Sequence, residues 1–464
     1  MPAPPSTVTQ EIFRSRWMAP QADITAPQGY QTTFVNGEQV DSELMVDDGI
    51  IQDLKEGIWL GPVRLGLGLS VGAEYSDQQD NNTATNSSDD WSPFVSPSLA
   101  LTYDREVGPW TINARYAGGI TYYTNPNYNS GGTSSQRNPL TQTGSFGVGH
   151  TGDRHRLTLS GAASGGTGFS IDAGENINQT NAAAALDWIY ILGNFINVGA
   201  KANYSTQISE YSESTYQDTT LTTWNADLLS EWSVTGKSQI RFVLGTGRTE
   251  QDFGGPEQAW RSYTQALTGW RYAPTEKIRT EILAGVAYVE GNEATDERFL
   301  GPRLAYRFTG TYDATAKTSI RATFGLDATD IQPDFRLEAF WRPRETTGVS
   351  LGAYQDQSYS STSFGQFQIN RGFVLSMSQQ LLSKLELLLS AGYQQTENIN
   401  LDGGLDQPSY EYGFGSAALT YRLNRWSSLR FSWWQTFDTG EEQTTTTNGQ
   451  QQGTRITASF NLTF

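Results

Sequence analysis

The sequence predicts an all-β protein: a transmembrane antiparallel up-and-down β-barrel of about 20 strands with a short irregular N-terminal segment. Three observations lead to this prediction. The hydrophobic pattern has a two-residue period from residue 62 onward, short turns alternate with long polar loops, and aromatic residues gather beside the turns. A composition with 47 Gly, 13 Trp, 22 Tyr and 21 Phe residues also favours strands and turns over helices.

Charge and residue types narrow the functional classes. The 464 residues include 49 acidic and 31 basic ones, and the net charge of −18 disfavours a nucleic-acid partner, which needs a basic surface. No apolar run approaches the roughly 18 to 20 residues that a membrane-spanning helix requires. The absence of cysteine excludes disulfides, thiol nucleophiles and cysteine metal ligands.

The chain divides into residues 1–61 and a barrel formed by residues 62–464. The first part lacks the two-residue period and begins with a Pro-rich stretch, which favours an extended conformation. We expect it to be either a periplasmic tail or an element that occupies the lumen or the mouth of the barrel.

The barrel strands are predicted from alternation. In the first strand Val63, Leu65 and Leu67 share one parity, whereas Arg64 and Gly66 hold the other. Successive side chains of a strand point to opposite faces, so the pattern predicts one apolar and one polar face. The runs reach about 9 to 14 residues, which is longer than the five or six that are usual in soluble sandwiches.

Short turns separate pairs of runs at one end of the barrel, the short-turn end. They are centred at residues 107, 152, 193, 236, 275, 315, 345, 383 and 424. Longer polar connections mark the opposite end, the loop end, and span residues 77–90, 126–138, 210–218, 290–297, 396–407 and 439–452. This alternation is typical of an up-and-down barrel whose short turns face the periplasm.

Aromatic residues lie where such a barrel would meet the two membrane interfaces. One predicted girdle, beside the short turns, consists of Trp110, Trp188, Tyr190, Trp232, Trp270, Tyr272, Tyr306, Trp341, Tyr421, Trp426 and Trp433. A second, toward the loops, consists of Tyr75, Trp224, Trp260 and Tyr288. Interfacial belts of Trp and Tyr are characteristic of membrane proteins.

The last strand carries a family resemblance. Phe460, Leu462 and the terminal Phe464 share the apolar parity of an alternating segment, and Gly453 precedes it. This segment resembles the C-terminal assembly signal of bacterial outer-membrane β-barrel proteins. The resemblance implies a location in the outer membrane of a Gram-negative bacterium, contact with outer-membrane lipid, and insertion by the barrel-assembly machinery.

Catalytic and metal sites are not predicted. Outer-membrane enzymes that resemble omptins or phospholipase A use a histidine near the outer rim, whereas the only histidines here, His150 and His155, flank a short turn. Two ligands do not make a metal site, and the acidic loops lack regular ligand spacing. We therefore expect no enzyme activity, no metal and no cofactor.

The polar parity places charged residues in the lumen. A predicted basic patch on consecutive strands, near their short-turn ends, consists of Arg241, Arg271, Arg279, Arg303, Arg307 and Arg321. Inward acidic residues include Glu281, Asp327 and Glu338. Such arginines either pair with carboxylates to satisfy an enclosed polar interior or bias a water-filled pore toward anions, and both roles can coexist.

These observations predict a porin-like channel for passive diffusion of small hydrophilic solutes, anionic ones or saccharides among them. One alternative is a structural barrel that anchors surface loops or forms the membrane part of a larger assembly. A third is an exit pore for an exopolysaccharide. The sequence leaves open whether the barrel forms a homo-oligomer.

Overall fold

The computed structural model describes residues 58–76, 90–124, 140–170, 175–193, 195–211, 218–252, 258–292, 300–315, 317–328, 332–359, 366–400, 410–438 and 453–463. The strands are β1 (Ile58–Leu60), β2 (Val63–Ser76), β3 (Asp90–Val107), β4 (Trp110–Ile120), β5 (Tyr122–Tyr123), β6 (Leu140–Thr151), β7 (His155–Ser170), β8 (Glu175–Leu192), β9 (Ile196–Tyr211), β10 (Thr219–Thr235), β11 (Ser238–Asp252), β12 (Gln258–Thr275), β13 (Ile278–Gly291), β14 (Gly301–Thr315), β15 (Thr318–Leu326), β16 (Asp334–Arg344), β17 (Thr347–Tyr359), β18 (Gln366–Leu382), β19 (Leu385–Asn400), β20 (Tyr410–Asn424), β21 (Ser427–Asp438) and β22 (Gly453–Thr463). Across these residues, no helix is long and apolar enough to cross a membrane.

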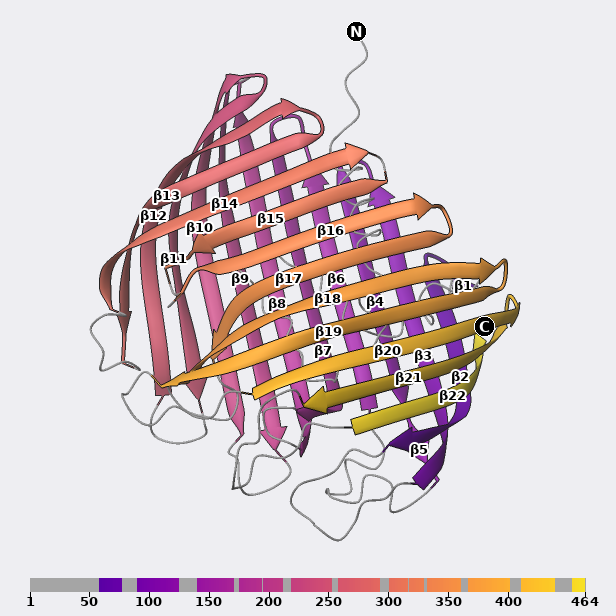
Figure 1. Ribbon diagram of the computed structural model, residues 1–464. Coiled ribbons are helices and arrows are strands. Elements are labelled where there is room, and N and C mark those ends of the chain that lie inside the picture. The colour runs from indigo at the N-terminus through magenta and orange to yellow at the C-terminus, as the bar shows by residue number, and fades with distance from the viewer. Residues whose placement is uncertain are drawn as a thin grey trace.

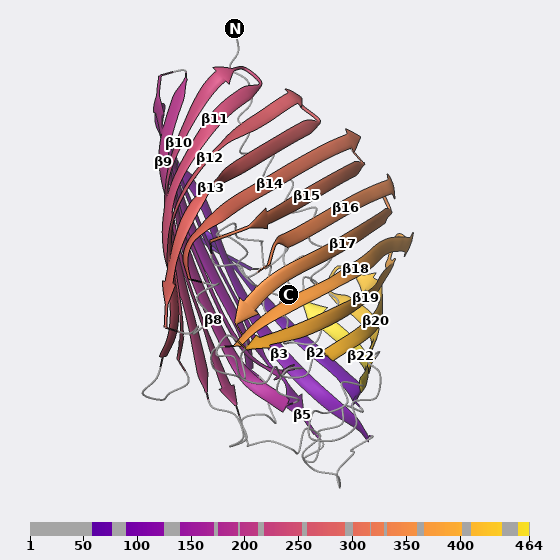
Figure 2. The same cartoon turned by 60° about the vertical axis from the view of Figure 1, so that its left-hand side comes forward.

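The strands form a closed antiparallel barrel of 20 strands, as the sequence predicts. Each long strand pairs with its neighbours in sequence, and β4 and β5 form one strand interrupted at Thr121. The predicted short turns all join antiparallel neighbours, for example Thr235 with Ser238 and Asn424 with Ser427. Figures 1 and 2 show β14–β20 lying opposite β3–β8, with β10–β13 connecting the two walls.

Some strands extend further toward the loop end than predicted. Strand β19 continues to Asn400, although the sequence analysis assigns a loop from residue 396. The backbone of Thr396 still pairs with Asn370 of β18, because polar side chains do not prevent a ladder from continuing. Most of the other predicted loop residues lie outside the described residues, as do residues 1–57.

The outward face is an apolar belt. Large hydrophobic side chains of one parity are exposed on nearly every strand, as at Leu228, Leu244 and Val286. Trp residues beside the short turns, such as Trp232 and Trp270, are exposed on the same face, in agreement with the predicted girdle. A closed barrel that presents such a belt has its polar backbone paired internally and its apolar side chains toward lipid.

The first and last long strands close the barrel. Gly68–Ser76 of β2 pairs with Arg455–Thr463 of β22, and β1 pairs with the remaining Val63–Leu65 on the same edge. A turn at Gly61, with φ of 67°, brings β1 back along β2. On the inward side of this seam, Arg455 Nη2 donates to Glu74 Oε2 at 2.8 Å, and Tyr123 Oη donates to Glu74 Oε1 at 3.3 Å.

The wall turns sharply at β12–β13. Cα atoms of β12 and β14, two strands apart, lie within 8 Å of each other. Inward Gly269 and Gly285 lie at this corner, where a Cβ would collide with the carbonyl oxygens of Ile282 and Ala266. Inside the corner, Val243, Leu267, Leu283, Ala287, Val289 and Ala305 form a buried apolar cluster. The corner therefore has a dry core of its own.

The corner predicts a position-specific requirement for glycine. Gly269→Ala or Gly285→Ala should lower the free energy of unfolding by about 1–3 kcal/mol, because the added methyl group forces the two backbones apart. The measurement is urea unfolding of the barrel refolded in detergent. Gly166→Ala is the matched control, since its Cβ would meet nothing nearer than Thr141 Cγ2 at 3.4 Å. Equal losses in all three variants would refute the close approach.

Candidate functional site

A four-residue charge network occupies the inward wall near the short-turn end. Arg241 Nη1 of β11 donates to Glu281 Oε1 of β13 at 2.6 Å, and Arg271 Nε of β12 donates to Glu281 Oε2 at 2.8 Å. Glu231 of β10 accepts ion pairs from both arginines at 3.4 Å. The side chains of Arg241, Glu231 and Glu281 are only 14%, 19% and 17% exposed.

The network joins strands that are not neighbours. Adjacent strands lie about 4.8 Å apart, so Arg241 and Glu281 must reach across β12 on the concave side of the wall. Farther along the corner, Arg307 of β14 pairs with Asp327. Arg307 Nη2 donates to both oxygens of Asp327 at 2.8 Å. The folded wall thus brings opposite charges together across several strands.

The other predicted lumen residues are placed differently. Arg321 lies opposite Glu338 in register, and Glu338 Oε1 accepts a hydrogen bond from Arg336 Nε at 2.7 Å. Arg279 is exposed at the short-turn end. Arg303 lies beside Gly301 at the loop end of β14, and so the expectation that all six arginines lie near the short-turn end is wrong for this residue. A role in anion selectivity stays a prediction.

Inward side chains at the loop end are buried on about half of the strands of the barrel. Near-complete burial is found on β3, β9–β13 and β18–β21, at Ser92, Ser209, Thr219, Gln251, Arg261, Val289, Gln368, Thr396, Tyr412 and Thr436. Arg261 and Tyr412 are each 1% exposed, although an inward side chain in an open lumen of this width would face water. By contrast, inward Asn113, Arg115 and Arg279 at the short-turn end are exposed. Inward side chains of the described wall are therefore more deeply buried toward the loop end than toward the short turns.

Only part of the predicted assembly signal lies within the described residues. Phe460 and Leu462 share the outward parity of β22 and pair with Leu429 and Ser427 of β21. Phe464 lies outside the described residues. Recognition of this strand during insertion stays a prediction.

The described wall was also compared with the predictions for metal ligands and histidines. Within the described ranges, no group of three or more His, Asp or Glu residues is arranged to hold a metal ion. The rings of His150 and His155 stack at 4.7 Å beside the turn they flank, and Trp110 packs against His150 at 4.4 Å. Both histidines therefore lie at the short-turn end, away from the lumen.

Sequence reasoning identified the inward parity but missed which charges meet. Parity alone tells on which face of its strand a side chain lies. The partners of Arg241 and Arg271 depend in addition on the strand register and on the corner at β12–β13. The glycines at 269 and 285, opposite Leu283 and Leu267, are the sequence signal that could have located the corner. The buried loop end has no comparable signal, because its residue types are mixed.

The charge network predicts unequal effects for two inward arginines. Arg241→Ala should lower the free energy of unfolding by roughly 3 kcal/mol, because Glu231 and Glu281 lose a shared cation in a partly buried site. Arg279→Ala should change it by less than about 0.5 kcal/mol, since this side chain is exposed. Urea unfolding of the refolded barrel measures both. Adding Glu281→Gln to Arg241→Ala should recover part of the loss, and no recovery would contradict the pairing.

The comparisons with known proteins find similarity in fold. No protein-family model matches the sequence, and no curated protein matches it significantly. The FrpB iron transporter from Neisseria meningitidis is 11% identical with a TM-score of 0.48, and the match covers 89% of this chain and 84% of that chain. The siderophore receptor PiuA from Acinetobacter baumannii is 11% identical with a TM-score of 0.44, covering 88% and 82%. The copper transporter OprC is 11% identical with a TM-score of 0.43, covering 88% and 81%.

These findings correct the predicted function. The matched structures are named as transporters or receptors and not as porins. The prediction of a porin-like channel for passive diffusion is therefore wrong. The closed barrel and its lipid-facing belt make this chain a bacterial outer-membrane β-barrel protein.

Proposed function

We propose that this protein is a gated outer-membrane transporter, which admits a small hydrophilic solute only when its loop end opens. The observation that carries the proposal is the burial of inward side chains at the loop end, on β3, β9–β13 and β18–β21. The exposed inward residues at the short-turn end support it, because they leave an aqueous vestibule on the side that we assign to the periplasm.

The wall itself supports gating by the loop end rather than by collapse of the barrel. The corner between β12 and β13 is held by an apolar cluster and by ion pairs that span two strands. Packed cores resist continuous deformation, so the strands form a rigid frame around whatever moves. Opening then requires that the buried groups at the loop end become exposed, while the charge network remains intact.

The proposal includes three further parts. The protein acts without catalysis, since the only two histidines lie at a short turn. The barrel-assembly machinery inserts it through its C-terminal strand, on the resemblance of Phe460 and Leu462 to an assembly signal. Small hydrophilic solutes are its cargo, because the inward parity is polar over most of the wall.

Conductance across a planar bilayer tests the gate. The wild-type barrel should be closed most of the time, with brief openings. Arg261→Ala should raise the open probability several-fold, because it removes a large side chain that is 1% exposed at the loop end. Arg279→Ala is the matched control, since it removes an exposed inward arginine from the adjacent strand and should change nothing.

Two results would overturn the proposal. A steady, fully open conductance of the wild type would mean that the buried loop-end groups do not block the lumen. A barrel that never opens, in the wild type or with Arg261→Ala, and that admits no hydrophilic dye into proteoliposomes, would mean that it does not transport.

A further inference from the structure

A groove lies on the lipid-facing side of the barrel, near the short-turn end of β20–β22. These three strands are neighbours in the sheet, and Figure 1 shows them side by side at the end of the chain. The groove has a volume of about 400 Å³, within the range of roughly 300–1,000 Å³ that is usual for ligand pockets. It is lined by the outward residues Leu419, Tyr421, Leu429, Phe431 and Ala458, and by Arg430 and Ser459 of the other parity.

The groove forms because large and small outward side chains meet across these strands. In register, Leu419 of β20 lies opposite Phe431 of β21, and Phe431 lies opposite Ala458 of β22. Phe431 and Leu429 are 49% and 46% exposed, so they project from the wall. Ala458 pairs on its other side with Ala73 of β2. Two adjacent alanines beside these large side chains leave a depression with an apolar floor.

Two basic side chains lie at the short turns beside the groove. Lys384, in the turn between β18 and β19, donates from Nζ to the backbone oxygen of Leu423 at 2.9 Å. This hydrogen bond holds the ammonium group against the next hairpin, which turns at Arg425 and Trp426. The guanidinium carbon of Arg425 lies 4.6 Å from the centre of the Trp426 ring. Both cations therefore lie at the short-turn end of β20.

The charge of these two turns is not balanced by acids within them. Neither 382–385 nor 423–426 contains an acidic residue. Glu386, the first acid after the turn between β18 and β19, has its Oε2 3.8 Å from Arg422 Nη2. The two turns therefore present positive charge at the rim of a protein whose net charge is −18.

Tyr421 indicates the depth of the groove in the membrane. It lines the groove on the side nearest the turn and is 40% exposed. Tyr and Trp side chains gather at the level of the lipid headgroups. Phe431 and Ala458 lie farther from the turn along their strands, at the level of the acyl chains. Lys384 and Arg425, in the turns themselves, lie at the level of the headgroups.

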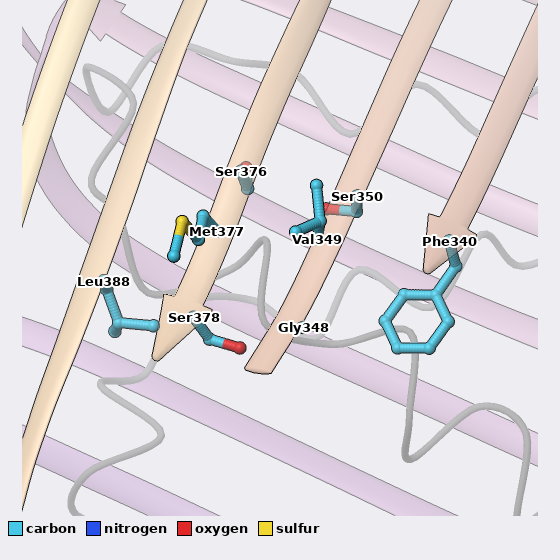
Figure 3. A pocket seen from close by; sticks show the side chains of 8 residues that line it. All are labelled: Phe340, Gly348, Val349, Ser350, Ser376, Met377, Ser378 and Leu388. Carbon is cyan, nitrogen blue, oxygen red and sulfur yellow. The ribbon is translucent and has the colours of Figure 1, made fainter. Parts of the chain in front are cut away.

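A hollow in the wall between β16 and β19 is far smaller than this groove. Its volume is about 10 Å³, which is room for about one water molecule. Figure 3 shows its lining, with Gly348 between Phe340 and Ser378. Of these two spaces, the groove on β20–β22 is the one that can receive a larger ligand, and its apolar lining faces the lipid.

We infer that the groove on β20–β22 is a binding site for an anionic phospholipid of the leaflet at the short-turn end. One acyl chain lies in the groove, over Ala458, and the phosphate is held by Lys384 and Arg425. Basic clusters beside a membrane attract anionic headgroups, so the two cations select among lipids whose acyl chains are the same. The site lies on the outer face and is independent of transport through the lumen.

Native mass spectrometry of the full-length barrel, refolded in a neutral detergent, tests the choice of headgroup. The wild type should bind one phosphatidylglycerol saturably, and several-fold more tightly than phosphatidylcholine with the same acyl chains. Lys384→Gln combined with Arg425→Gln should abolish this preference, because both cations are lost. Lys237→Gln combined with Lys317→Gln is the matched control, since it removes two exposed lysines from short turns that also lack acidic residues, and it should keep the preference.

Filling the groove tests where the acyl chain lies. Ala458→Phe should weaken the binding of both lipids by about five- to tenfold, because the added ring occupies the depression and removes apolar contacts. Ala284→Phe is the matched control, since Ala284 is an exposed alanine on the lipid-facing side of β13, and it should bind as the wild type does. If Ala458→Phe does not fold, the double variant of Lys384 and Arg425 still decides the inference, because it changes only exposed turn residues.

Four results would overturn the lipid site. The first is an absence of saturable phosphatidylglycerol binding, and the second is equal affinity of the wild type for the two lipids. The third is equal behaviour of the groove or charge variants and their controls. The fourth is an occupant of another kind: inorganic phosphate bound in place of the lipid, or a lipid-free dimer of the wild type that Ala458→Phe dissociates, which would assign the groove to a second copy of the chain.

Discussion

Closure of the sheet between β2 and β22 is the constraint on which the rest of the structure depends. In a bilayer, every backbone N–H and C=O must find a partner inside the sheet, so an unpaired strand edge is excluded. The pairing of Gly68–Ser76 with Arg455–Thr463 meets this demand over most of the seam, and β1 pairs with what remains of the β2 edge. A closed wall of 20 strands has a fixed perimeter. If the barrel were round, its lumen would be far wider than the inward side chains could fill.

The corner at β12–β13 changes how that perimeter is used. Gly269 and Gly285 let two backbones approach on the inward side, and Leu267 and Leu283 fill the angle. Once the wall is folded, charges on β10 come within reach of β12, β13 and β14. Arginines that would stand free in a round pore instead share carboxylates, as Arg241 and Arg271 share Glu231 and Glu281. These paired charges are therefore part of the rigid barrel wall.

Much of this fold could be predicted from the sequence, because a two-residue period and regular turns are local signals. The strand at residues 63–76, the turn at Thr235–Ser238 and the inward parity of Arg241 all follow from spacing alone. The pairing of Arg241 with Glu281 could not be predicted, since it spans three strands and depends on curvature. The position of Arg303 at the loop end of β14 was not predicted, because strand boundaries are less certain than strand parity. Burial of Arg261 and Tyr412 at the loop end depends on long-range packing, so it could not be predicted from the alternation of apolar and polar residues.

The two walls of the lumen differ because they meet different physical demands. Opposite charges on β10–β15 are held together by a corner that excludes water, and their mutual pairing leaves little charge to act on a passing solute. On β16–β21 the wall is not folded on itself, and small serines line up where paired registers repeat the same residue type on neighbouring strands.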